Sequence, residues 1–181
     1  MQPMSLTQEV IEDVRRVVVS EGVNALLVDD LTKDDLPLIA WAGGPSHAAN
    51  VGRTLERVVA GEVEYLAVRA RNGQPIALGG IDYTEHHGAG TLSQLASAAQ
   101  SLGIGTHLIR AAEERIRSRG LRTAMMGVED NNPRARALYE RLGYRECGRE
   151  KASWEEHDAD GCPFLYETEL TFLKKDLVQA G

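Results

Sequence analysis

The stretch Gln100-Ser101-Leu102-Gly103-Ile104-Gly105-Thr106 decides the fold, because two closely spaced glycines stand directly ahead of a helical pattern. Residues 91–97 just before it predict a strand, so the order is strand, glycine turn, helix. The first backbone N–H groups of a helix lack partners and carry partial positive charge. Such a turn suits a bulky anion, for example a diphosphate. The apolar face of the helix comprises Ile104, Leu108, Ile109, Ala112 and Ile116.

Two familiar phosphate-binding motifs do not fit this turn. A Walker loop requires a lysine directly after its last glycine, and no lysine follows Gly105. A dinucleotide-binding turn requires a third glycine three positions later, where this chain has Leu108. What remains is the pattern Gln-x-x-Gly-x-Gly. The alternative is a glycine turn that only packs a helix on a strand.

A second segment, NPRARALYERLGY at residues 132–144, follows at a fitting distance after a predicted strand at 123–128. It resembles the Asn-x-x-Ala-x-x-Leu-Tyr-Glu-x-x-Gly-aromatic helix of the GCN5-related N-acetyltransferases, the GNAT family. The Gln-x-x-Gly-x-Gly turn is similar to the loop in which that family holds the pyrophosphate of acetyl-coenzyme A (acetyl-CoA). The resemblance runs from about Leu26 to Lys174 and is sharp from Thr91 to Tyr144.

The resemblance implies the fold class, α/β (α+β). We expect a mixed, mostly antiparallel sheet of about six or seven strands, flanked by about four helices. An amphipathic helix at 5–20, with Ser5 as a candidate cap, precedes the matching part. Residues 1–22 are therefore expected to form a helical extension, and residues 23–181 a single acetyltransferase domain. The extension packs on its own domain or on a second subunit, so a homodimer is a candidate assembly.

The remaining elements follow from apolar periodicity and turn residues. The pair Asn72-Gly73 predicts a hairpin with a type I′ turn, and Gly79-Gly80 predicts a bulge or a close backbone approach. A closing antiparallel pair is expected at 144–154 and 164–172. The other expected elements are a strand at 25–28, helices at 32–41 and 48–60 around a loop at 43–47, strands at 64–71 and 75–83, and helices at 104–119 and 133–142.

The resemblance also implies the site residues. Leu95, Ala96 and Ser97 would pair with the pantetheine arm of acetyl-CoA, although the link to the loop, Ala98-Ala99, is shorter than the family commonly has. Asn132 would contact the pantetheine part, and Tyr139 would donate a proton to the departing thiolate. The pyrophosphate would lie on Gln100, Ser101, Leu102, Gly103, Ile104, Gly105 and Thr106.

The implied function is transfer of an acetyl group from acetyl-CoA to a primary amine by direct attack, and the alternative is a non-catalytic acyl-CoA sensor or interaction domain. The family lines the acceptor side with its first helical pair, so Trp41 and His47 are candidate substrate contacts. The base that deprotonates the amine stays open. The candidates are Glu85, Glu129, Asp130 and His47.

Composition limits the partners. The chain has 181 residues, of which 43% are hydrophobic, and a net charge of −7. That charge disfavours nucleic acid and leaves a small-molecule or peptide amine as the expected partner. No apolar run reaches the about 18 residues that span a membrane, and no signal pattern opens the chain. Cys147 and Cys162 lack metal-ligand spacing, so we expect no metal and a cytoplasmic location.

Overall fold

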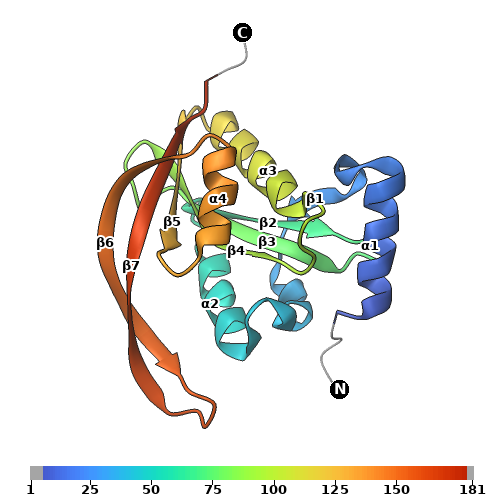
Figure 1. Ribbon diagram of the computed structural model, residues 1–181, viewed down its shortest axis with the longest axis horizontal. Helices are drawn as coiled ribbons and strands as arrows, with labels where there is room; N and C mark the ends of the chain where they lie inside the picture. The colour runs from blue at the N-terminus through green and yellow to red at the C-terminus, as the bar shows by residue number, and fades with distance from the viewer. Residues whose placement is uncertain (1–5, 179–181) are drawn as a thin grey trace.

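A seven-stranded sheet forms the body of the protein in the computed structural model, which describes residues 6–178 (Figure 1). The strand order is β1-β2-β3-β4-β5-β7-β6, and every neighbouring pair is antiparallel except β4 and β5. This confirms the expected mixed, mostly antiparallel sheet. The strands are β1 (Leu27–Asp30), β2 (Val63–Arg69), β3 (Pro75–Asp82), β4 (Ala89–Ser97), β5 (Thr123–Glu129), β6 (Arg145–His157) and β7 (Pro163–Asp176).

The helices cover both faces of the sheet. Figure 1 shows α3 and α4 on one side, α2 on the other, and α1 beside the β1 edge. The larger core cluster joins α1 and α3 to the sheet, and a smaller one lies beneath α2. The helices are α1 (Gln8–Glu21), α2 (Gly44–Glu56), α3 (Ile104–Ser118) and α4 (Pro133–Arg141), with short 3₁₀ turns η1 (Val23–Ala25), η2 (Lys33–Leu38) and η3 (Ala40–Ala42).

The sheet splays open between β4 and β5. The two strands pair only over Ala89–Leu92 and Thr123–Met126. Beyond that point β5 continues to pair with β7, as far as Glu129. The second half of β4 therefore presents an unpaired edge towards β5, and its backbone groups there are available to a ligand that lies alongside.

A β-bulge marks the point where β4 leaves β5. In the register with β3, Leu78 pairs with Ala96 and Gly80 pairs with Ser93, so β4 carries an extra residue here. Gln94 has a φ of 55°, which is uncommon for a residue with a side chain. A Cβ on Gly79 would come within 2.4 Å of the Leu95 side chain. The bulge expected at Gly79-Gly80 is confirmed by this register shift, and the Leu95 side chain explains why β3 needs a glycine there.

The segment before α2 differs from the expected helix at 32–41. It forms the two 3₁₀ turns η2 and η3 instead, because Pro37 lacks an N–H and disfavours helical backbone at Leu36. The helix α2 begins at Gly44 rather than Ala48, since Pro45 fits a first helical turn. His47 consequently lies on a helix and not in a loop.

The hairpin at Asn72-Gly73 is confirmed, but its turn type was wrong. Only Gly73 has a positive φ, of 87°, whereas a type I′ turn needs positive φ at both central residues. The Asn72 Oδ1 atom instead accepts a hydrogen bond of 3.0 Å from the Gln74 amide, which holds Asn72 in another conformation.

The N-terminal helix packs on its own domain. Val14 and Val17 are buried in the larger core cluster. The hydroxyl of Thr7 caps the helix, accepting a hydrogen bond of 3.4 Å from the Val10 amide. The predicted cap Ser5 lies outside the described residues. In the part of the chain described, no helix is long and apolar enough to cross a membrane.

Candidate active site

The amides of the glycine loop lack hydrogen-bond partners within the described structure. Gly103 caps α3 with a φ of 77°, and Ser101 is also left-handed, with a φ of 64°. Among the described residues, no amide from Leu102 to Thr106 donates a hydrogen bond to the protein. The first to do so is that of His107, to the Gly103 carbonyl at 2.9 Å. This is the arrangement that binds an anion at a helix N-terminus.

A cavity of about 450 Å³ lies between this loop and α4. Its wall brings together eight of the predicted cofactor residues: Ser97, Gln100, Ser101, Gly103, Ile104, Gly105, Thr106 and Asn132. Leu102 is not part of this wall and packs against the larger core cluster. The Asn132 Oδ1 atom also caps α4, at 3.2 Å from the Ala135 amide.

Two arginines of this wall were not predicted from the sequence. Arg134 and Arg141 line the cavity from α4, and the Arg134 guanidinium donates a hydrogen bond of 3.2 Å to the Ser101 hydroxyl. Their spacing of seven residues places both on one helix face, which was the available signal. Guanidinium groups complement phosphate oxygens in charge and geometry.

A second cavity, of about 120 Å³, continues from the first along the open edge of β4. Ser97, Gly105 and Leu138 line both cavities, and the second one adds the predicted residues Leu95, Ala96 and Tyr139. Burial raises the pKa of the Tyr139 phenol above its ordinary value of 10.0. Within residues 6–178 its hydroxyl makes no hydrogen bond, so it can donate to a bound group.

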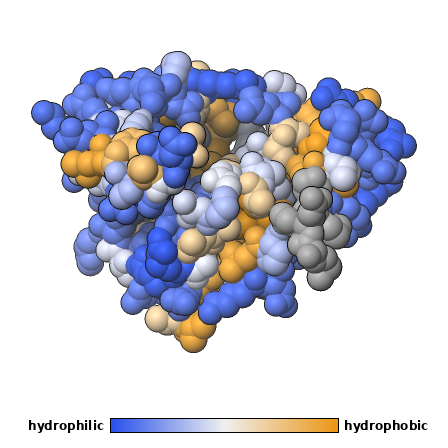
Figure 2. Space-filling view, turned by 90° about the horizontal axis from the view of Figure 1, so that it is seen from below, coloured by the Kyte–Doolittle hydropathy of each residue, from blue (hydrophilic) through white to orange (hydrophobic). Residues whose placement is uncertain are grey.

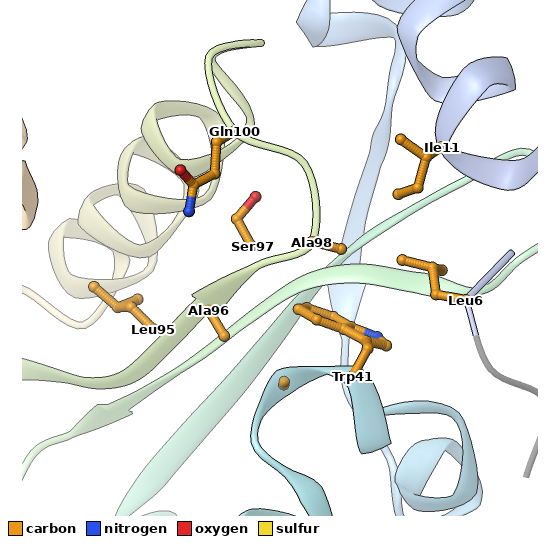
Figure 3. A pocket seen from close by; sticks show the side chains of 9 residues that line it. Leu6, Ile11, Trp41, Leu95, Ala96, Ser97, Ala98 and Gln100 are labelled. Carbon is orange, nitrogen blue, oxygen red and sulfur yellow. The ribbon is translucent and has the colours of Figure 1, made fainter. Parts of the chain in front are cut away.

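A third cavity, of about 530 Å³, lies on the other side of the β4 end (Figure 3). Trp41 lines it, held by a hydrogen bond of 3.1 Å from its indole N–H to the Pro75 carbonyl. Leu6 and Ile11 of the N-terminal extension line it from the right in this view. The same stretch of β4, residues 95–97, thus separates two cavities.

The model of the acetyltransferase (GNAT) family matches residues 29–144, which is more than half of the chain. The chain belongs to the GNAT family. Its matched region contains the β4 bulge, the glycine loop and Tyr139, so the sequence resemblance is confirmed. Members of the family are acetyltransferases, and this protein is therefore an acyltransferase of the GNAT type.

Solved structures share the fold across most of the chain. The ribosomal-protein-S18-alanine N-acetyltransferase of Escherichia coli matches with a TM-score of 0.65 and 20% identity, covering 86% of this chain and 96% of that one. A ribosomal-protein-alanine N-acetyltransferase of Brucella melitensis matches with a TM-score of 0.64 and 24% identity, covering 84% and 100%. A phosphinothricin acetyltransferase of Sinorhizobium meliloti, solved with acetyl-CoA, matches with a TM-score of 0.64 and 19% identity, covering 84% and 88%. No curated protein matches the sequence.

The candidate bases differ in their surroundings. Glu129 accepts a hydrogen bond of 3.0 Å from the Tyr166 hydroxyl, and Asp130 accepts one of 3.0 Å from Thr171. Burial and the nearby carboxylates raise the pKa of Glu85, although His86 opposes this. Burial lowers the pKa of His47, whose Nε2 atom is enclosed without a partner in the described structure. A raised carboxylate pKa is what a base acting near neutral pH requires.

A hydrogen bond from β2, which lies on the far side of β3, holds Gln94, the residue of the bulge with positive φ. The hydroxyl of Tyr65, which is buried under α2, donates a hydrogen bond of 3.0 Å to the Gln94 Oε1 atom. Tyr83 makes a comparable bond of 2.7 Å to Glu64 away from the cavities, which provides a matched control.

Replacing Tyr65→Phe is expected to raise the KM for acetyl-CoA about fivefold, because one hydrogen bond worth about 1 kcal/mol no longer fixes the bulge beside the second cavity. Steady-state kinetics at saturating amine measure this. Tyr83→Phe also deletes one hydrogen bond, so it should lower stability similarly and leave the KM within about twofold. Equal KM changes in the two variants would contradict the role of the bulge.

Proposed function

We propose that this protein transfers the acetyl group of acetyl-CoA to a primary amine by direct attack. One observation supports this most: residues 103–106, whose amides have no partner in the described structure, line a cavity that continues to Tyr139. The diphosphate would lie on those amides beside Arg134 and Arg141. The pantetheine arm would extend along the open edge of Leu95 to Ser97, with Asn132 nearby. The short Ala98-Ala99 link lets one cavity wall include both Ser97 and Gln100.

The chemistry assigned to the site is acyl transfer in two steps. The neutral amine nitrogen attacks the thioester carbon, forming the C–N bond and a tetrahedral oxyanion. The C–S bond then breaks as the carbonyl re-forms, and the Tyr139 phenol gives its proton to the departing thiolate sulfur. The proton that the amine loses passes to a base on the acceptor side or to water. The site also holds the two reactants together, and this positioning supplies a large share of the rate acceleration.

The acceptor is a small-molecule or peptide amine. The names of the similar solved structures span both classes, from ribosomal proteins to phosphinothricin. Trp41 and the third cavity are the proposed lining for its body. A non-catalytic acyl-CoA sensor would not need a buried phenol with an unengaged hydroxyl in the cofactor cavity, so Tyr139 favours the enzyme. A homodimer and a cytoplasmic location stay predictions.

A thiol-release assay tests the proposal. The protein, acetyl-CoA and a panel of small and peptide amines are expected to release coenzyme A at a rate well above the same mixture without amine. The acetylated amine, identified by mass spectrometry, should match the thiol released in amount. Tight binding of acetyl-CoA without release on any amine would favour the sensor instead.

A further inference from the structure

The strands β6 and β7 continue together beyond the sheet as a two-stranded ribbon. β5 pairs with β7 only as far as Leu170, whereas β6 pairs with seven more residues of β7, to Pro163. At about 3.3 Å per residue the ribbon extends about 20 Å past the sheet. Figure 1 shows it bending towards the side of the sheet that α2 covers. We use "ribbon" for residues 151–157 and 163–169.

Aromatic side chains line one face of the ribbon. Trp154 and Tyr166 pair across the two strands, with ring centroids 5.1 Å apart. Side chains alternate along a strand, so Phe164 and Phe172 lie on the same face as Tyr166. Phe164 is 46% exposed and Trp154 is 37% exposed. Exposed large apolar side chains in a row mark a contact surface. We call this set, Trp154, Phe164, Tyr166 and Phe172, the aromatic face.

The charge of the ribbon and its turn is almost entirely negative. Residues 150–169 contain seven carboxylates and a single lysine, although the whole chain has a net charge of only −7. Within the described structure none of these carboxylates pairs with Lys or Arg. Two such ribbons would repel each other, which disfavours a second copy of the chain as the occupant. The carboxylates are Glu150 and Glu156 on the aromatic face, Asp158 and Asp160 in the turn at its end, and Glu155, Glu167 and Glu169 on the opposite face.

The aromatic face lies on the acceptor side of the sheet and reaches the point where β4 and β5 splay apart. Phe172 lies opposite Gly127 in the register, on the sheet face that α2 covers, and its ring packs against His86 at 5.5 Å. The Tyr166 hydroxyl contacts both Glu129, at the end of β5, and Asn131, at 3.2 Å. The cofactor cavities lie on the opposite side, with α3 and α4. Figure 2, seen from the α2 side, shows hydrophobic patches within a mostly hydrophilic surface.

We propose that the aromatic face docks a cationic polypeptide whose N-terminal or lysine amine is the acceptor. This rests on the proposed function and names its substrate class. An open strip about 20 Å long fits an extended chain, whereas small ligands prefer enclosed pockets. Lysine and arginine stems pack on aromatic rings while their charges reach the carboxylates at the rim.

Binding is tested without turnover. The chain has two tryptophans, so a Trp41→Phe background leaves Trp154 as the fluorescence reporter. The probes are a Lys/Arg-rich peptide of about 12 residues, a Gly/Ser peptide of equal length, and spermine. The basic peptide should bind saturably, with affinity falling about tenfold between about 50 mM and about 300 mM salt. An absence of basic-peptide binding, or equal affinity for spermine, would overturn the proposal.

Charge variants separate docking from catalysis. A ribbon variant should raise the KM for the basic peptide about tenfold at unchanged kcat, while both constants for ethylamine stay within about twofold. A control variant that removes three carboxylates elsewhere should change neither. Equal effects in the two would overturn the docking surface. The ribbon variant is Glu156→Gln, Asp158→Asn and Asp160→Asn, which lie on the aromatic face or in the turn at its end, and the control is Glu9→Gln, Glu12→Gln and Glu114→Gln.

The two proposals fail in different ways. A basic peptide that binds at Trp154 but is never acetylated, while ethylamine is, would overturn the aromatic face as the acceptor surface. Failure of every amine to release thiol would contradict the proposed function, whatever the fluorescence shows.

Discussion

Tyr139→Phe is expected to lower kcat about 100-fold and to leave the Kd for acetyl-CoA within about threefold, because the substitution removes a proton donor and keeps the ring. The ring packs in the second cavity, and the hydroxyl has no hydrogen bond to lose within residues 6–178. Folding stability should therefore change little. Thiol release at saturating substrates gives kcat, and calorimetric titration gives the Kd.

The pH dependence of turnover gives a second test of the proton-donor role of Tyr139. Burial raises the pKa of Tyr139 above 10.0, and a phenol donates its proton only in the neutral form, which persists below the pKa. The ratio of wild-type to Tyr139→Phe rates should thus stay constant from about pH 6 to about pH 9. Equal turnover by the two proteins across that range would remove Tyr139 from the mechanism.

Gly105→Ala is expected to weaken acetyl-CoA binding at least about tenfold while slightly stabilising the fold. A Cβ at Gly105 would meet only the Leu138 side chain, at 3.7 Å, which is ordinary contact. Alanine within a helix adds up to about 1 kcal/mol to the free energy of unfolding relative to glycine. The added methyl would, however, project where the two cofactor cavities meet, because Gly105 lines both.

A control distinguishes this effect from glycine loss in general. Gly148 in β6 has no atom within 4 Å of an added Cβ and lies outside the cavities. Gly148→Ala should bind acetyl-CoA as the wild type does. Thermal unfolding and calorimetric titration of both variants measure the two quantities. Unchanged acetyl-CoA affinity in Gly105→Ala would show that the cofactor does not pass this residue.

The sequence predicted those parts of the site that depend on local signals. The two glycines and the apolar stripe from Ile104 to Ile116 identified the turn and α3 without tertiary information. The same holds for α4, where Asn132 caps the helix and Pro133 opens it. The prediction of Tyr139 as a site residue rested only on the family resemblance. In the structure, Tyr139 lines the cavity that adjoins the loop.

Features that depend on tertiary context were missed. The left-handed backbone at Gln94 has no local signal, because glutamine rarely adopts it, and only the facing Gly79 hinted at it. Pro37 interrupts the helix expected at 32–41, and 3₁₀ turns form there instead. The ribbon extends further than apolar periodicity predicts, since its length is set by strand pairing and not by burial.

The central claim is that the amides between Leu102 and Thr106 bind the diphosphate of coenzyme A. Titrating ¹⁵N-labelled protein with coenzyme A, while recording backbone amide resonances, tests it most directly. We expect the largest saturable shifts at Gly103, Ile104, Gly105 and Thr106, with a second set around Tyr139. Saturation of binding with those four amides unmoved, and with the shifts confined to other parts of the molecule, would contradict the claim.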